Sequence, residues 1–200
     1  MNEKPILFNA EMVNAILSGR KTQTRRIMRD QPEVIPPEDE CGVPGYWIPY
    51  NAGKTMVRNE MMTIACPLGM RGDQLWVREA FAAGLCTEST LAYRATHKTD
   101  DLEEGWGETI KWTPSIHMPR WASRINLLIT GVRVERLNDI SEQDARAEGV
   151  NTWKGPAEEI VGGKLAFLEL WDSIYGQKEG ESWQANPWVW VINFERMEAK

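Results

Sequence analysis

The chain has 200 residues, of which 42% are hydrophobic, and a formal net charge of −6. This length allows one elaborated domain with a real core. The acidic balance argues against a protein that coats nucleic acid nonspecifically, because that affinity comes mostly from many phosphate contacts.

The first predicted element is a short amphipathic helix. Its apolar positions recur on one face of a 3.6-residue period, at Ala10, Val13, Ile16 and Leu17. Asn9 is a good N-cap, and Gly19 can close the helix in the left-handed conformation. The apolar period then vanishes until Ile27, so we expect residues 20–26 to form a loop or the start of an edge strand, with side chains free to face a cleft.

This segment is locally cationic. It carries four positive side chains and no carboxylate: Arg20, Lys21, Arg25 and Arg26. A local field opposed to the charge of the whole chain favours an anionic or electron-rich ligand. The lysine and two threonines within it could form a lysine-activated hydroxyl. The simpler interpretation is that the cations only stabilise the carbonyl end of the helix.

The middle of the chain is irregular. Prolines and acidic residues over 29–53 predict a long loop or insertion, with room for a short strand. A Gly-Asp turn precedes a strand over 74–81, and residues 91–95 form another candidate strand. Residues 98–119 predict a second loop insertion. We therefore expect a single domain over 1–200 with insertions at about 29–66 and 97–119.

The clearest strand follows, from Ile125 to Leu137, with Gly131 placed for a bulge or bend. Ser141 and Asp144 form the pattern of a capping box, which predicts a helix that stops at Gly149.

A longer helix is predicted over 156–175, with proline in its first turn, and a strand over 188–194 follows. Strands far apart in sequence with few crossover helices favour an α+β fold with a small mixed barrel over a doubly wound sheet.

Cysteine and histidine usage gives no metal pattern. Cys41, Cys66 and Cys86 are odd in number and lack C-x-x-C spacing, so they are interpreted as reduced thiols. With only His97 and His117 besides, we expect no metal and no cofactor. No signal peptide or membrane-spanning run is evident, so we expect a cytoplasmic protein without a membrane partner. The oligomeric state is left open.

Ten tryptophans stand out in the composition. Most are expected in the core or at its boundary, but Trp121 follows Pro119 and Arg120, which favours a surface that combines a cation with an aromatic ring. A proline turn with Trp121 packed inward is the alternative.

Several motifs together resemble the ASCH-domain family: Leu17-Ser18-Gly19-Arg20-Lys21-Thr22-Gln23-Thr24, Gly72-Asp73-Gln74-Leu75-Trp76-Val77, Ala145-Arg146-Ala147-Glu148-Gly149 and a last strand through Phe194. The match looks closest to longer members found in prophages and phages. The resemblance implies a PUA-like β-barrel with flanking helices and the two loop insertions. It also implies a nucleoside or RNA as partner. The G-R-K-T-x-T stretch is similar to that of a small bacterial N(4)-acetylcytidine amidohydrolase.

By motif position, the resemblance implies a catalytic group of Lys21, Thr24 and Glu148. The substrate-binding candidates are Arg20, Arg25, Arg26, Trp76, Arg120 and Trp121. This chain departs from the small amidohydrolases in being about twice as long and in carrying Arg25-Arg26 where they have one arginine.

A hydrolase of this kind needs a neutral lysine. The ordinary lysine pKa must fall by about three units, or about 4 kcal/mol, and both burial and neighbouring arginines act in that direction. An ionised Glu148 beside Lys21 would oppose the fall, so we expect Glu148 nearer the leaving amine. Strand alternation places Lys21 and Thr24 on opposite faces, which makes Thr22 a substitute nucleophile.

Three other functions fit the sequence. The first is a non-catalytic module that binds RNA or a modified base, with phosphate contacts from the arginines and stacking on Trp76 or Trp121. The second is a ribonuclease that uses no metal. The third is a structural role in phage assembly.

Overall fold

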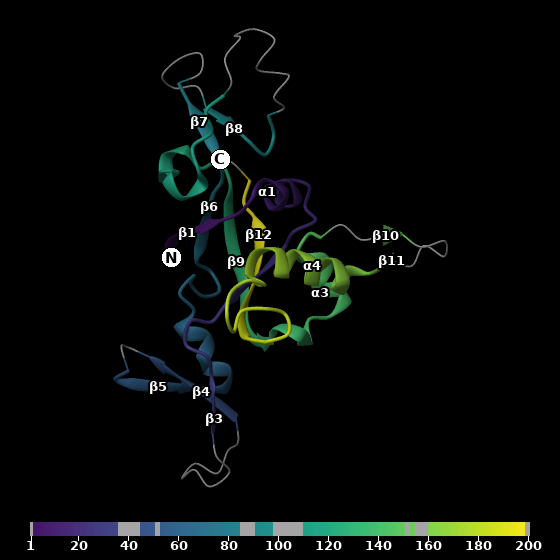
Figure 1. The fold of residues 1–200 in the computed structure, drawn as a ribbon. Helices are drawn as coiled ribbons and strands as arrows, with labels where there is room; N and C mark the ends of the chain where they lie inside the picture. The colour runs from purple at the N-terminus through teal and green to yellow at the C-terminus, as the bar shows by residue number, and fades with distance from the viewer. Residues whose placement is uncertain are drawn as a thin grey trace.

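The structure, a computed structural model, describes residues 2–35, 45–50, 53–84, 91–97, 110–150, 153–154 and 160–198. Its centre is a five-stranded mixed sheet with the strand order β1-β6-β9-β12-β2 (Figure 1). The strands are β1 (Glu3–Leu7), β6 (Gln74–Arg78), β9 (Asn126–Arg136), β12 (Trp188–Arg196) and β2 (Gln23–Ile27). Strands β1 and β6 are parallel, and the other neighbours are antiparallel.

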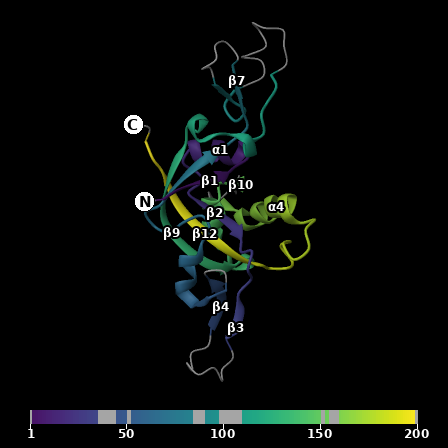
Figure 2. The same ribbon diagram turned by 90° about the vertical axis from the view of Figure 1, so that its left-hand side faces the viewer.

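The α+β fold predicted from the sequence is confirmed. The long strands β9 and β12 curve strongly (Figure 2), so the two edge strands approach each other. Arg26 on β2 donates from Nη2 to the carbonyl oxygen of Leu7 on β1 at 2.9 Å. Over the described residues the backbone ladder stays open between these edges, so the sheet is a curled half-barrel rather than a closed one.

Local sequence signals set the first helix as predicted. Helix α1 (Ala10–Leu17) begins where the Asn9 side chain accepts from the backbone N–H of Met12. It ends at Gly19, whose φ of +76° is left-handed. Strand β2 begins four residues later and is an edge strand, in line with the vanished apolar period.

The second half of the chain also follows its local signals. Gly131 pairs with Asn193, next to a register shift between β9 and β12, so the predicted bulge is confirmed. Helix α3 (Glu142–Ala147) begins at Ser141, whose Oγ accepts from the Asp144 backbone N–H at 3.0 Å. Gly149 follows with a φ of +84°.

The start predicted for the long helix is wrong. Helix α4 runs over Gly163–Tyr175, because residues Ile160–Val161 form strand β11 against β10 (Trp153–Lys154). Gly162 has a φ of +83°, a left-handed conformation that separates the strand from the helix. Pro156, expected in the first turn, lies outside the described residues.

The proline-rich region holds more strand than expected. Within 29–66, β3 (Glu33–Ile35), β4 (Gly45–Tyr50) and β5 (Thr55–Arg58) form a three-stranded antiparallel sheet, followed by a 3-10 helix, η1 (Asn59–Ala65). Ile48 on β4 pairs with Val57 on β5, and both are buried, so core burial outweighs the prolines. The residues missed by the prediction are β-forming and aromatic.

A small hairpin precedes the second predicted insertion of 97–119. The strand expected over 74–81 ends at Arg78, and β7 (Phe81–Ala83) pairs with β8 (Leu91–Tyr93). Short 3-10 helices follow: η2 (Ser115–His117), η3 (Arg120–Ala122) and η4 (Leu137–Asp139). The β3–β5 sheet and the β7–β8 hairpin lie at opposite ends of the central sheet (Figure 1). Residues 98–109 lie outside the described part of the chain.

Two apolar clusters lie on the two faces of β12. The larger lies inside the curled sheet and includes Ile6, Leu75, Leu127, Ile192 and Phe194. The smaller joins α3 and α4 to the other face of β12 through Leu137, Ala145, Phe167, Trp171, Val189 and Val191.

Two further predictions concern residues outside these clusters. Cys66 is a free, buried thiol, while Cys41 and Cys86 lie outside the described residues. None of the described helices is long and apolar enough to cross a membrane.

Candidate functional site

Lys21 lies between the end of α1 and the residue that follows α3. Its backbone N–H donates to the carbonyl of Ala15 at 3.0 Å, and the Thr22 N–H donates to Ala147 at 2.8 Å. Lys21 also forms an antiparallel bridge with Glu148. Three local features of the sequence therefore bring these segments together: the turn at Gly19, the end of α3 and the left-handed Gly149.

The Lys21 amine is buried against Glu148. Nζ donates at 2.8 Å to Glu148 Oε2 and at 2.8 Å to the Glu148 carbonyl, and the lysine side chain is fully buried. This burial lowers the pKa of Lys21 below the ordinary lysine value, against the attraction of the Glu148 carboxylate; the charges of Arg26 and Arg25 add to the lowering.

The expected position of Glu148 is corrected in one respect. The carboxylate lies directly on the lysine rather than away from it, and desolvation outweighs its effect on the lysine pKa. Because a neutral amine has two N–H groups and one lone pair, the two bonds to Glu148 leave one direction of Nζ uncommitted.

Thr24 is buried on β2, and its hydroxyl accepts a hydrogen bond from Arg26 Nη1 at 3.0 Å. A hydroxyl has two lone pairs and one proton, so this bond leaves the proton available for a base. Thr22 is exposed, so its hydroxyl does not share this environment and it is the weaker candidate for the nucleophile.

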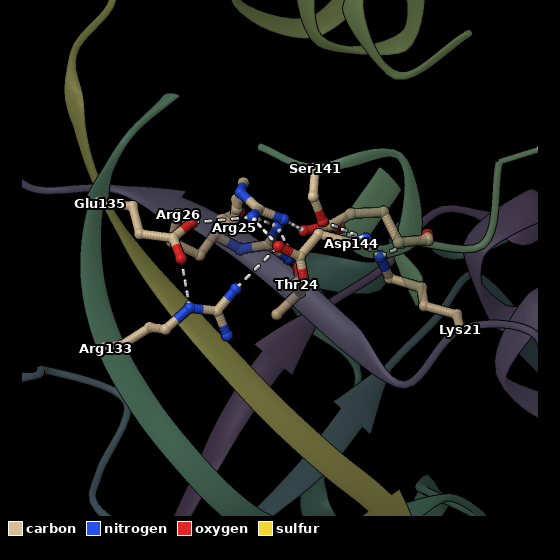
Figure 3. Close-up of polar contacts among 9 residues, drawn as sticks. Lys21, Thr24, Arg25, Arg26, Arg133, Glu135, Ser141 and Asp144 are labelled. Carbon is tan, nitrogen blue, oxygen red and sulfur yellow. Dashed lines mark hydrogen bonds and ion pairs between the residues drawn. The ribbon is translucent and has the colours of Figure 1, made fainter. Parts of the chain in front are cut away.

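Arg25 is fully buried and is surrounded by carboxylates (Figure 3). Nη1 donates to Glu148 Oε1 at 3.1 Å, and Nη2 contacts Glu135 Oε2 at 2.9 Å and Asp144 Oδ2 at 3.5 Å. Arg133 contacts the same two carboxylates from the outer side, with 3.2 Å between its Nη2 and Asp144 Oδ2. The expectation that the cationic side chains are free to face a cleft is therefore wrong for Lys21 and Arg25.

Two cavities meet at Glu148. An inner one of about 20 Å³ is lined by Thr24, Arg25, Arg26 and Glu148 and is covered by α4 residues that include Phe167 and Trp171. An outer one of about 220 Å³ is lined by Glu11, Arg20, Glu148 and Gly149. Met12 and Leu170 line both cavities and therefore lie between them.

Arg20 belongs to this outer cavity. Its Nη1 donates to the Gly149 carbonyl at 3.1 Å, and its Nε donates to Ser18 Oγ at 3.2 Å. Arg20 therefore helps to hold the segment that carries Glu148, at the edge of the outer cavity.

The other predicted binding residues form a separate group on β6 and η3. Arg78 and Arg120 lie over the Trp76 ring, with 5.2 and 5.7 Å from each guanidinium carbon to the ring centroid. Arg120 also forms two hydrogen bonds with the Glu3 carboxylate. The hydrogen bond from Arg120 lowers the pKa of Glu3. Trp121 is 69% exposed rather than packed inward.

Two of the carboxylates that surround Arg25, those of Glu135 and Asp144, were not predicted as site residues. Glu135 was predicted only as part of a strand, and Asp144 only as part of a capping box. No local signal pairs either one with Arg25, because Glu135 is 110 residues away along the chain. Over the described residues, no group of three or more His, Cys, Asp or Glu side chains is arranged to hold a metal ion.

Comparisons with known proteins give little beyond this geometry. No family model matches the sequence, and no curated protein matches it. The structure is similar to a high-resolution crystal structure of an ASCH domain from Lactobacillus crispatus JV V101, with a TM-score of 0.40 and 13% identity, over 98% of this chain and 79% of that chain. A likeness this distant does not assign the chain to a family.

Proposed function

We propose that this protein is an amide hydrolase that removes an acyl group from the amino group of a nucleoside or an RNA base. Lys21 is the general base, Thr24 the nucleophile, and Glu148 holds the lysine amine in place. The observation that carries the proposal is the fully buried Lys21 amine on Glu148, a residue that lines the same cavity as Thr24. A buried lysine with a lowered pKa, paired with a residue that lines a cavity, is a candidate for chemistry.

The reaction balances with these groups alone. Neutral Lys21 takes the Thr24 proton as Oγ attacks the acyl carbon, and the protonated lysine then gives that proton to the departing amine. The acyl group remains on Thr24 as an ester. A water molecule attacks the ester, Lys21 takes the proton of that water and returns it to Thr24 Oγ, and a carboxylic acid leaves.

Arg26 supports the first step. Its positive charge and its hydrogen bond to Thr24 Oγ at 3.0 Å favour the alkoxide over the alcohol. Arg26 is itself fixed by bonds from Nη1 to the Arg25 carbonyl at 3.1 Å and from Nη2 to the Leu7 carbonyl at 2.9 Å. The donor is thus positioned before any substrate arrives.

The inner cavity is too small for a nucleoside. A volume of about 20 Å³ holds about one water molecule. We therefore place the base of the substrate in the outer cavity of about 220 Å³, with the acyl group passing between Met12 and Leu170 to reach Thr24. The Met12 side chain is unbranched and flexible, so small rotations of Met12 and Leu170 are enough to open this route.

The test is hydrolysis of a panel of N-acylated nucleosides by the purified protein, read by chromatography. Thr24→Val keeps the shape of the side chain and removes the hydroxyl, and Lys21→Met removes the amine. Each is expected to lower kcat/KM by about 10²-fold or more, while Thr24→Ser keeps measurable activity. Full turnover by Thr24→Val would refute the nucleophile.

A binding module is the second candidate, and the Trp76 group favours it. Trp121 is exposed, so its ring offers a face on which an unpaired base can stack. Nearby, Arg78 and Arg120 lie over the Trp76 ring and add positive charge to the same surface. In that case a single-stranded RNA oligonucleotide binds with a strong salt dependence, Trp121→Ala weakens binding and Thr24→Val does not. Cleavage of labelled RNA in the presence of a chelator would instead favour the ribonuclease.

A further inference from the structure

Arg25 contacts the Glu148 carboxylate of the Lys21–Glu148 pair and also lines the inner cavity beside Thr24. The two oxygens of the Glu148 carboxylate are divided: Oε2 accepts from Lys21 at 2.8 Å and Oε1 accepts from Arg25 at 3.1 Å. A carboxylate bound only to lysine would form a simple buried ion pair, which favours the charged ammonium. The second cation on the same carboxylate weakens that preference.

Arg25 is itself held by carboxylates on its far side. Its Nη2 lies 2.9 Å from Glu135 Oε2 and 3.5 Å from Asp144 Oδ2, and Arg133 closes the group at a partly exposed position. The planar guanidinium is suited to this bridging, because it presents several donors in a fixed geometry. In the amide orientation that satisfies both of its ends, Gln23 turns its side-chain oxygen toward Arg25 Nη1, at 2.6 Å.

We propose that Arg25 is a positioning residue that shares the Glu148 carboxylate with Lys21 and so leaves the Lys21 amine able to release its proton. This inference rests on the proposed hydrolase function for its kinetic consequence, but not for its electrostatic one. Glu135 and Asp144 have a supporting role: they fix Arg25 in place and partly offset its charge. Alternating charges thus run from the buried amine to the surface at Arg133.

The surroundings of Lys21 support this division of charge. From β2 it faces the cations Arg25 and Arg26, and after α3 it faces the Glu148 carboxylate. From the end of β1 the Phe8 ring lies 5.6 Å from Nζ. Glu11 on α1 and Arg20 lie on the rim of the outer cavity, and Glu135 and Asp144 lie behind Arg25. Arg25 contributes to the lowered pKa of Lys21, after burial as the main cause.

Two substitutions should shift the pH at which the Lys21 amine loses its proton, in opposite directions. Arg25→Met removes a positive charge and leaves Glu148 entirely to Lys21, so Lys21 should keep its proton to higher pH. Asp144→Asn removes a negative charge behind Arg25 and keeps the shape of the side chain, so Lys21 should lose its proton at lower pH. A residue that only stabilises the fold would not produce this reversal of sign.

The experiment measures Lys21 in two ways. The first is NMR titration of protein labelled at lysine Cε, with Lys21→Met to assign the signal. The second is the pH profile of kcat/KM on an N-acylated cytidine. For Arg25→Met we expect the titration midpoint and the rising limb of the profile to move to higher pH, with about tenfold or greater loss of kcat/KM at pH 7, which stays below the roughly 10⁴-fold that a positioned base contributes at most.

The controls separate the outcomes. The control variant is Arg136→Met. Arg136 lies beside Glu135 on β9 and donates to the Asn186 carbonyl, so its loss should leave the titration midpoint of Lys21 unchanged. Arg25→Lys keeps the charge and should leave the Lys21 midpoint close to the wild-type value, and Arg25→Gln removes the charge if Arg25→Met does not fold. Midpoints that do not move in Arg25→Met or Arg25→Gln, or that move in the same direction as in Asp144→Asn, overturn the role of Arg25. If the wild type hydrolyses no acylated nucleoside while the NMR midpoints move as expected, the hydrolase proposal fails and the electrostatic role of Arg25 stands.

Discussion

Gly149 lies so close to Lys21 that a methyl group on its α-carbon would sit 2.8 Å from the Lys21 Cβ. It would also sit 2.8 Å from the Cβ of Ala15, and the φ of +84° is left-handed. The glycine that ends α3 is therefore also the residue that allows α3 to bring Glu148 against Lys21. The same small residue serves the backbone turn and the contact across the site.

The first prediction concerns this contact. Gly149→Ala should lower the free energy of unfolding by about 2–4 kcal/mol, because it adds a steric clash to the cost of a left-handed alanine. Gly19→Ala is the matched control: its φ is +76°, but nothing lies within 4 Å of the added methyl group. It should cost only about 1 kcal/mol. Urea denaturation measures both, and equal losses would show that the close approach is unimportant.

A second prediction compares a buried and an exposed carboxylate. Glu148→Gln leaves Lys21 and Arg25 without their shared counter-ion, and should cost about 3 kcal/mol or more of unfolding free energy. Glu3→Gln breaks the exposed pair with Arg120 and should cost less than about 1 kcal/mol, because solvent screens it. Thermal or urea unfolding distinguishes them. A loss for Glu148→Gln as small as that for Glu3→Gln would contradict the buried pair.

The third prediction follows from the lowered pKa of Lys21. Between that lowered pKa and the ordinary value of 10.5, the unfolded chain binds more protons at this lysine than the folded chain does. The free energy of unfolding therefore increases as the pH rises through that window, and it decreases as the pH falls from 10.5 towards the folded pKa. Between neutral pH and pH 10, the free energy of unfolding of the wild type should increase relative to that of Lys21→Met, as measured by urea denaturation.

The control for this pH effect is Lys54→Met, which removes an exposed ammonium from β4–β5 instead of a buried one. The difference between wild type and Lys21→Met should change with pH more than the difference between wild type and Lys54→Met. If the two variants give parallel curves of unfolding free energy against pH, folding does not lower the pKa of Lys21.

A fourth prediction concerns access to Thr24. Leu170→Ala shortens a side chain that lines both cavities, so it should join them, lower KM for an acylated nucleoside and admit larger acyl groups. Leu165→Ala on the same helix removes an equal volume from a side chain that is 60% exposed and should leave KM unchanged. The measurement is steady-state hydrolysis across a series of acyl lengths. Identical acyl preferences in the two variants would place the route elsewhere.

Much of the fold follows from short stretches of sequence. The cap at Asn9, the turn at Gly19 and the cap at Ser141 each depend on residues within about one helical turn, and each forms as predicted. The β-branched run of β9 and the aromatic run of β12 form strands for a similar reason: these residues pack well on a half-buried sheet.

Local signals failed where pairing partners decided the conformation. Residues 160–161 pair with 153–154, so α4 begins later than the apolar pattern suggests. Strands β3 to β5 form in spite of the prolines in this region, because Ile48 on β4 pairs with Val57 on β5 and both side chains are buried. Neither outcome can be read from a window of neighbouring residues.

The candidate site divides in the same way. By itself, the sequence determined which residues are candidates for the proposed chemistry: a lysine and a threonine in one cationic stretch, and a glutamate at the end of a short helix. Only the tertiary structure decided that Lys21 meets Glu148 across 127 positions of chain, and that Arg25 is enclosed by carboxylates instead of facing a ligand. The physical reason is range. Caps, turns and periodicity act between near neighbours, whereas burial and the pairing of charges depend on which distant segments the folded sheet brings together.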